Sequence, residues 1–271
     1  MPGPIPSWLS SGRGGVPLVL LHGMGSTADA WLPQLYALSA QRQVVAWTAP
    51  GYGNSPPLAE LGWPALADAL AAMLDVLEIP RAHILGHSIG GMVAQEFYHR
   101  HPQRVQSLTL SATSAAFGAK DPQWTQGFIR QRIEPLEQYE SFAAAAPTLL
   151  ANFMSPTTPP SLRHLAELSA SRIQRGRYVE YLHLLTRFDR KAQAADIRAP
   201  VLLLAGEHDT QAPPRGMQAL AQRIPGARFH VIAGAAHMAN LEASDAFNQT
   251  LEDFLAQAPA STFPTLQQDI L

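Results

Sequence analysis

The pentapeptide Gly-His-Ser-Ile-Gly at residues 86–90 holds the side chain best suited to covalent chemistry, the hydroxyl of Ser88. An apolar run at residues 82–85 precedes it and predicts a strand, and residues 89–99 predict a helix. A strand that turns directly into a helix through G-x-S-x-G forms a nucleophile elbow, and small flanking residues permit the tight turn. We therefore predict that Ser88 is a nucleophile exposed at the carboxyl end of a strand.

A serine becomes a good nucleophile when a histidine takes its proton and a carboxylate orients that histidine. The apolar run at residues 201–205 predicts a buried strand, which Glu207 and Asp209 follow. A further strand at residues 228–232 leads into a loop of small residues that ends in His237. We favour Asp209 as the acid because it lies further past the strand end, and Glu207 is the alternative. His237 is the predicted base.

Attack on a carbonyl also requires hydrogen-bond donors for the oxyanion that forms. One predicted donor is the backbone N–H of Ile89, the residue after the nucleophile. The strand predicted at residues 18–21 runs into His-Gly-Met-Gly at residues 22–25, a shortened relative of the H-G-G-G oxyanion motif. Met24 is therefore the candidate for the second N–H, and we expect His22 to brace this loop through hydrogen bonds.

Along the chain the H-G loop comes first, followed by the serine elbow, the acid and the histidine. Motifs in this order resemble those of the α/β-hydrolase fold superfamily, and within it the cap-bearing serine hydrolases similar to 3-oxoadipate enol-lactonases and carboxylesterases. The stretch Pro-Gly-Tyr-Gly-Asn-Ser at residues 50–55 matches the P-G-x-G-x-S loop of that group. The resemblance implies hydrolysis of a small-molecule ester or lactone through an acyl-enzyme. Ser88, His237 and Asp209 would form the triad, and the reaction requires no metal or organic cofactor.

Other activities occur on the same fold. Haloalkane dehalogenases and epoxide hydrolases use an aspartate at the elbow, so Ser88 argues against both. Hydrolases of carbon–carbon bonds in vinylogous diketones keep the serine triad, but they generally have Asn where this chain has His87; they are the alternative prediction. Acyltransferases and perhydrolases would use the same residues, and a non-catalytic receptor would not need a complete triad. We expect His87 to pack within the elbow.

Strand and helix signals alternate along the chain, which predicts an α/β fold with a mostly parallel sheet flanked by helices. Strands are predicted at residues 18–21, 43–48, 83–85, 105–110, 201–205 and 228–232, and helices at 28–39, 63–77, 89–99, 215–223 and 241–257. Residues 115–195 break the alternation and predict helices separated by Pro135, Pro147 and the prolines at 156–160. We expect residues 115–195 to form a helical cap on a core of residues 1–114 and 196–271.

The N-terminal segment departs from the superfamily pattern. Members usually begin with an antiparallel hairpin, but only residues 1–15 precede the first predicted core strand here. Residues 1–6 are rich in proline and glycine, which resist sheet pairing. We therefore expect the edge hairpin to be reduced or absent.

The predicted cap provides two hints about the substrate. Residues 115–192 contain ten Lys and Arg against seven Asp and Glu, whereas the whole chain has a net charge of −2. A basic cap favours anionic substrates if its cations face the site, but such residues also commonly lie on solvated helix faces. Five aromatic residues either line the pocket or pack within the cap: Trp124, Phe128, Phe142, Phe153 and Tyr181.

Composition agrees with an enzyme of this kind. The chain has 271 residues, 46% of them hydrophobic, which is enough for one α/β domain with an insertion. It has no basic run, no zinc-type spacing and no apolar stretch of 18 residues, so we expect neither a nucleic-acid nor a membrane partner. We predict a cytoplasmic protein because the N-terminus has no secretion signal pattern.

Overall fold

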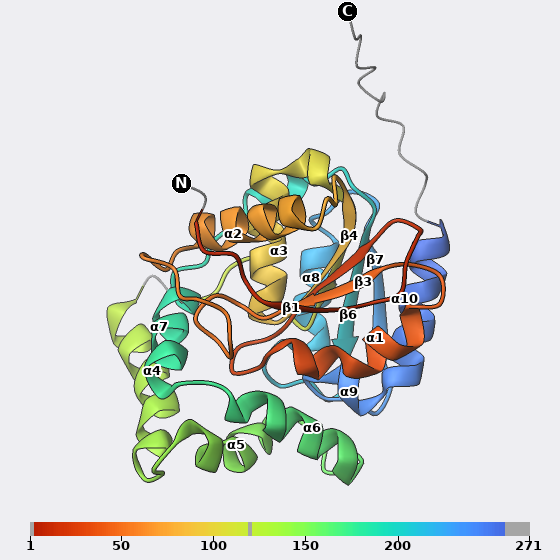
Figure 1. Ribbon diagram of the computed structural model, residues 1–271. Coiled ribbons are helices and arrows are strands. Elements are labelled where there is room, and N and C mark those ends of the chain that lie inside the picture. The colour runs from red at the N-terminus through yellow and green to blue at the C-terminus, as the bar shows by residue number, and fades with distance from the viewer. Residues whose placement is uncertain (1–2, 119–120, 258–271) are drawn as a thin grey trace, which may run out of the picture.

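A seven-stranded sheet runs through the molecule in the order β1-β3-β2-β4-β5-β6-β7 (Figure 1). The computed structural model describes residues 3–118 and 121–257. The strands are β1 (Trp8–Ser11), β2 (Leu18–Leu21), β3 (Val44–Trp47), β4 (Ala82–His87), β5 (Val105–Ser111), β6 (Val201–Gly206) and β7 (Arg228–Ile232). Strands β2 to β7 are parallel, which confirms the predicted α/β sheet.

The edge strand β1 pairs antiparallel with β3, with Trp8 opposite Trp47 and Ser11 opposite Val44. The expected reduction of the N-terminal hairpin is therefore confirmed, since a single short strand occupies that edge. Its position was not predicted, because the surrounding residues carry few strand signals.

Helices cover both faces of the sheet (Figure 1). Val19 and Leu21 of β2 pack in the same core as α2 (Trp63–Val76), α3 (Ile89–Arg100) and α8 (Pro214–Ala221). Leu18 and Leu20 point to the other face, where α1 (Leu32–Leu38) and α10 (Ser244–Gln257) pack. Shorter helical turns are η1 (Ala28–Trp31), η2 (Pro102–Arg104), η3 (Gln193–Asp196) and α9 (Ala239–Glu242). This two-sided burial explains why β2, β3 and β6 are apolar along nearly their whole length.

In the described part of the chain, four α-helices lie between β5 and β6: α4 (Pro122–Glu137), α5 (Phe142–Leu150), α6 (Pro160–Ser171) and α7 (Arg175–Leu185). We call α4 to α7 the helical insertion, and Figure 1 shows it at one end of the sheet. The prediction that Pro135 and Pro147 separate helices was wrong, because they lie inside α4 and α5. A proline there removes one backbone donor, and the neighbouring turns keep the helix intact. Helices α4 and α5 are separated instead before the side-chain cap Ser141, whereas the prolines at residues 156–160 do lie at the break before α6, as predicted.

Candidate active site

Ser88 occupies the sharp turn between β4 and α3, with a φ of 53° that is strained for a residue with a side chain. Hydrogen bonds fix this turn on both sides. The Ser88 N–H donates to the Ser111 carbonyl at 2.9 Å, and its own carbonyl accepts from the Gly91 N–H at 2.9 Å and the Thr113 hydroxyl at 2.7 Å. The backbone at Ser88 therefore has the predicted elbow conformation.

The two glycines of the motif are required because the turn leaves no room for side chains. A Cβ atom on Gly86 would lie 2.2 Å from the Gly90 carbonyl oxygen. A Cβ on Gly90 would lie 2.2 Å from the Leu21 carbonyl oxygen, on the neighbouring strand β2. Close approach of backbone to backbone thus sets these two positions, and it brings the start of α3 against the end of β2.

Asp209 and His237 meet after β6 and β7, where His237 Nδ1 lies 2.9 Å from Asp209 Oδ2. The other Asp209 oxygen accepts the N–H groups of Gln211 and Ala212 at 2.8 and 3.0 Å. Burial raises the pKa of Asp209, but the hydrogen bond and charge of His237 and the two backbone donors outweigh it, so the pKa is lower than usual. Asp209 is therefore an anion at neutral pH and orients the His237 ring through Nδ1.

Glu207, the alternative acid, makes other contacts. Its Oε2 accepts the Gly234 N–H at 2.8 Å and lies 3.9 Å from His208 Nε2, and half of the side chain is exposed. The geometry therefore brings Asp209, and not Glu207, to His237.

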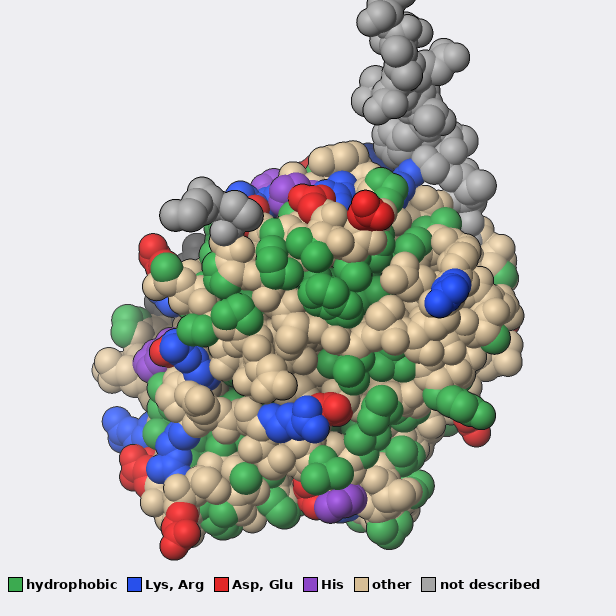
Figure 2. All heavy atoms as spheres, viewed as in Figure 1, with side chains coloured by type: hydrophobic (Ala, Val, Ile, Leu, Met, Phe, Trp, Pro, Cys, Tyr) green, Lys and Arg blue, Asp and Glu red, His purple; other side chains and the backbone are tan. Residues whose placement is uncertain are grey.

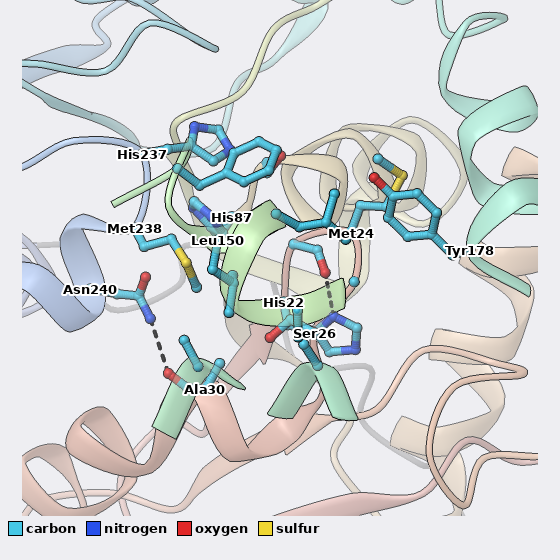
Figure 3. A pocket seen from close by; sticks show the side chains of 18 of the residues that line it. His22, Met24, Ser26, Ala30, His87, Leu150, Tyr178, His237, Met238 and Asn240 are labelled. Carbon is cyan, nitrogen blue, oxygen red and sulfur yellow. Dashed lines mark hydrogen bonds between the residues drawn. The ribbon is translucent and has the colours of Figure 1, made fainter. Parts of the chain in front are cut away.

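His87 packs against His237, with the ring centroids 4.9 Å apart, and Figure 3 shows the two rings next to each other at one side of the pocket. Burial, and then the neighbouring His237, lower the pKa of His87 to about 3. His87 is therefore neutral at neutral pH and adds no positive charge beside His237. This packing role is the one expected from its place inside the motif.

The loop after β2 is braced by His22, as predicted. His22 Nδ1 donates to the Gly23 carbonyl at 2.8 Å, and Nε2 accepts the Ala49 N–H at 2.9 Å, so one neutral tautomer satisfies both contacts. Burial lowers the pKa of His22 to about 4, which keeps the ring neutral. A Cβ on Gly23 would lie 2.9 Å from His87 Cδ2 and 3.4 Å from Ser88 Cβ, so this loop lies directly against the elbow.

One predicted oxyanion donor, Ile89, belongs to the elbow itself, and the other, Met24, lies in the loop that packs against the elbow. Ile89 is the first residue of α3, and N–H groups in the first turn of a helix have no acceptor within that helix. The Met24 N–H donates no hydrogen bond to another described residue. Met24 and Ser88 line the same pocket.

A pocket of about 70 Å³ is lined by Ser88, Met24 and His237 together with residues of the helical insertion. Figure 3 shows Met24 and His237 at this pocket. Its walls are mostly apolar, and Phe142, Leu150 and Phe153 come from the insertion. No Lys or Arg is among the described residues that line it. The pocket therefore presents a hydroxyl, an imidazole and apolar walls to a bound molecule, without a cation to hold an anionic group.

The aromatic residues of the insertion divide into two groups. Phe142 and Phe153 line the pocket, as one of the two interpretations expected. Trp124 and Phe128 stack on each other outside it, and the Tyr181 hydroxyl donates to the Pro50 carbonyl at 2.9 Å. The sequence did not single out Tyr178, Met238 or Asn240, which also line the pocket; their side chains carry no motif that would have indicated this.

Comparison with known proteins agrees with this architecture. The profile of the family described as "alpha/beta hydrolase fold" matches residues 16–244. A pimeloyl-(acyl-carrier protein) methyl ester esterase from Aeromonas hydrophila is 30% identical over 251 residues, which cover 89% of this chain and 96% of the esterase. The acetyltransferase component of an acetoin cleaving system from Pseudomonas putida is 31% identical over 260 residues, which cover 90% of this chain but 64% of that protein. The enol-lactonase from Burkholderia xenovorans superposes with a TM-score of 0.83 at 26% identity, covering 93% of this chain and 96% of the lactonase.

The fold, the elbow and the acid–histidine pair define a class of enzymes that act from the carboxyl edge of an α/β sheet. The chain belongs to the α/β-hydrolase fold family and is a hydrolase.

Proposed function

We propose that the protein hydrolyses a carboxylic ester or lactone through an acyl-enzyme on Ser88. The observation that carries this proposal is the hydrogen bond between Asp209 and His237, at a pocket that Ser88 also lines. The names of the esterase and lactonase relatives point to the same bond types. The predicted cytoplasmic location remains an expectation.

In the proposed reaction, His237 Nε2 takes the hydroxyl proton as Ser88 Oγ attacks the carbonyl carbon. Asp209 keeps the Nδ1 proton in place and stabilises the imidazolium. The oxyanion accepts the N–H groups of Met24 and Ile89, and each such donor is typically worth about 3 kcal/mol of barrier. Collapse breaks the acyl C–O bond, and His237 returns the proton to the leaving alkoxide oxygen. Water, deprotonated by the same imidazole, then attacks the acyl-enzyme and releases the acid and Ser88.

Ser88 Oγ has no hydrogen-bond partner among the described residues, so its contact with His237 is expected to form when substrate binds. Catalytic hydrogen bonds are often long in unliganded enzymes and tighten only in the complex.

We further propose that residues 115–195 act as a cap that sets substrate size. The pocket of about 70 Å³ is much smaller than the ~300–1,000 Å³ typical of sites for drug-sized ligands. A short acyl group fits this space, whereas a longer one requires the helical insertion to shift. Activity should therefore fall as the acyl chain of a p-nitrophenyl ester lengthens, unless the insertion opens.

The experiment that tests the proposal is turnover of p-nitrophenyl acetate by Ser88→Ala. We expect kcat to fall by about 10³-fold or more, because no nucleophile remains and only the binding contacts persist. Ser39→Ala is the control, since that exposed hydroxyl bonds only to the Tyr36 carbonyl at the end of α1. A Ser88→Ala variant with near wild-type turnover would remove Ser88 from the mechanism.

A further inference from the structure

Glu242, the last residue of α9, accepts hydrogen bonds from the loop that carries His237. Its Oε1 accepts the Met238 N–H at 2.8 Å, and its Oε2 accepts the Ala236 N–H at 3.1 Å. These two amides flank His237 on either side. One carboxylate therefore fixes the backbone on both sides of the imidazole.

The same carboxylate also contacts the turn between α5 and α6. Glu242 Oε2 accepts the Ser155 N–H at 2.6 Å and lies 3.4 Å from the Thr158 hydroxyl. His237 itself bonds to this turn, because its N–H donates to the Phe153 carbonyl at 3.0 Å, and the two rings lie 5.7 Å apart. The helical insertion and the His237 loop are thus joined at two neighbouring points.

No ion pair competes for this carboxylate among the described residues, so its oxygens are committed to backbone N–H groups and one hydroxyl. Hydrogen bonds from neutral donors to a carboxylate are shorter and stronger than those between neutral groups. A displacement of about 1 Å in a catalytic group is enough to lower a rate by about 10²-fold. The hydrogen bonds of this one carboxylate can therefore control how well His237 is aligned with Ser88.

We propose that Glu242 is a positioning residue for His237. It aligns the His237 loop only while its carboxylate also accepts the hydrogen bonds from residues 153–158, the turn between α5 and α6. Glu242 does not touch the reacting atoms; it acts through the backbone of the His237 loop. The effect on turnover rests on the proposed function, whereas the mechanical link between the two segments does not.

The test compares Glu242→Ala, Glu242→Gln and the control Glu252→Gln in the full chain. The Gln side chain keeps the shape of Glu but offers one acceptor oxygen. At the Oε2 position that oxygen can still accept from Ala236 and Ser155, so Gln loses the negative charge and the Met238 contact but not the link. Glu252 lies on α10, where it pairs with Arg42 at 3.4 Å and contacts neither segment. Hydrogen–deuterium exchange is measured on peptides that contain residues 153–158 and 236–238, and kcat is measured with p-nitrophenyl acetate well below each variant's Tm.

We expect both peptides to exchange at least about 10-fold faster in Glu242→Ala, and kcat to fall about 10- to 100-fold, with a smaller effect in Glu242→Gln. Glu252→Gln should match the wild type in both measurements. If the Ala variant does not fold, the Gln variant carries the comparison.

Two results would overturn the proposal: unchanged exchange in either peptide, or wild-type kcat in a folded Glu242→Ala whose two peptides exchange faster. A wild-type enzyme without esterase activity would count against the proposed function instead, and paired acceleration of the two peptides would still support the link.

Discussion

Each of the three proposed catalytic side chains is held in place by a different local constraint. Ser88 is held by a strained turn between two obligatory glycines. Asp209 is held by the backbone N–H groups of the turn that follows it. His237 is held through its backbone by Phe153 and by the Glu242 carboxylate on either side. The reactive atoms therefore depend on backbone contacts that are separate from the triad itself.

The pair Asp209 and Glu207 offers a direct comparison, because both are carboxylates past the end of β6. Asp209→Asn should lower kcat for p-nitrophenyl acetate by about 10³- to 10⁴-fold, since an amide cannot fix the required tautomer of His237. Glu207→Gln should stay within about threefold of the wild type, because its one loop contact is the Gly234 N–H. Steady-state kinetics on folded variants measures both. A larger loss in Glu207→Gln than in Asp209→Asn would reverse the assignment of the acid.

Helix α6 is tied to the loop after β2 through Ser169, whose side chain is completely buried. Its hydroxyl accepts the Thr27 N–H at 2.8 Å and lies 3.0 Å from the hydroxyls of Ser26 and Thr27. An ion pair between Arg172 and Asp29, at 3.4 Å, lies at the end of the same helix. The insertion is therefore anchored on the Ser88 side of the pocket as well as on the His237 side.

The serines on α6 provide a matched pair of variants. Ser169→Ala leaves the Thr27 N–H buried without its partner, so the free energy of unfolding should fall by about 1–3 kcal/mol. Ser171→Ala should change it by less than about 0.5 kcal/mol, because that exposed hydroxyl bonds only to the Leu168 carbonyl. Urea unfolding followed by fluorescence measures both values. Equal stability in the two variants would show that α6 is not anchored through Ser169.

At the level of elements, hydrophobic runs and the elbow motif were sufficient to predict the six parallel strands and most core helices. The last predicted helix was expected to run unbroken from residue 241, but it divides at Ala243, whose φ of −137° interrupts the helical backbone. Alanine is a strong helix former, so no sequence signal marks this break. The break ends α9 at Glu242, whose carboxylate contacts the His237 loop.

The proposed triad could be predicted from the sequence because each member lies in the turn or loop that follows a strand with a clear apolar pattern. The role of Glu242 could not, because its partners at Ser155 and Thr158 come from a helical insertion more than 80 residues away. The place of Tyr178 in the pocket could not be predicted for the same reason. It depends on contact between α7 and α5, where the Tyr178 ring lies 4.8 Å from that of Phe142. Contacts between distant segments depend on packing, which periodicity in one segment does not encode.

At the scale of the whole molecule, none of the described Lys and Arg side chains of residues 115–195 lines the pocket. Arg190 pairs with the buried Glu96 at 2.6 Å, Arg177 pairs with Glu180 at 2.8 Å, and Arg175 donates to the Tyr139 carbonyl. On the face shown in Figure 2, Lys and Arg lie scattered among Asp, Glu and uncharged residues. Within the described part of the chain, no helix is long and apolar enough to cross a membrane.

This distribution of charge predicts a preference for neutral substrates. The value of kcat/KM for p-nitrophenyl butyrate should exceed that for mono-p-nitrophenyl succinate by about 10-fold or more, because the pocket offers no cation to a buried carboxylate. The ratio of the two kcat/KM values should change less than about twofold between roughly 0.05 and 0.5 M salt. Salt screens ionic attraction, and the pocket has no cation that would attract the succinate carboxylate. Faster turnover of the succinate ester, declining with salt, would favour the anionic alternative.

The most direct test of the central claim is the site at which a fluorophosphonate bonds to the enzyme. Attack by Ser88 Oγ on phosphorus expels fluoride and leaves a stable phosphonyl ester, so intact mass should show one adduct per chain. Peptide mapping should place that adduct on Ser88, and the Ser88→Ala variant should remain unlabelled. An unmodified wild-type chain, or an adduct on another residue, would contradict the proposal that Ser88 is the activated nucleophile.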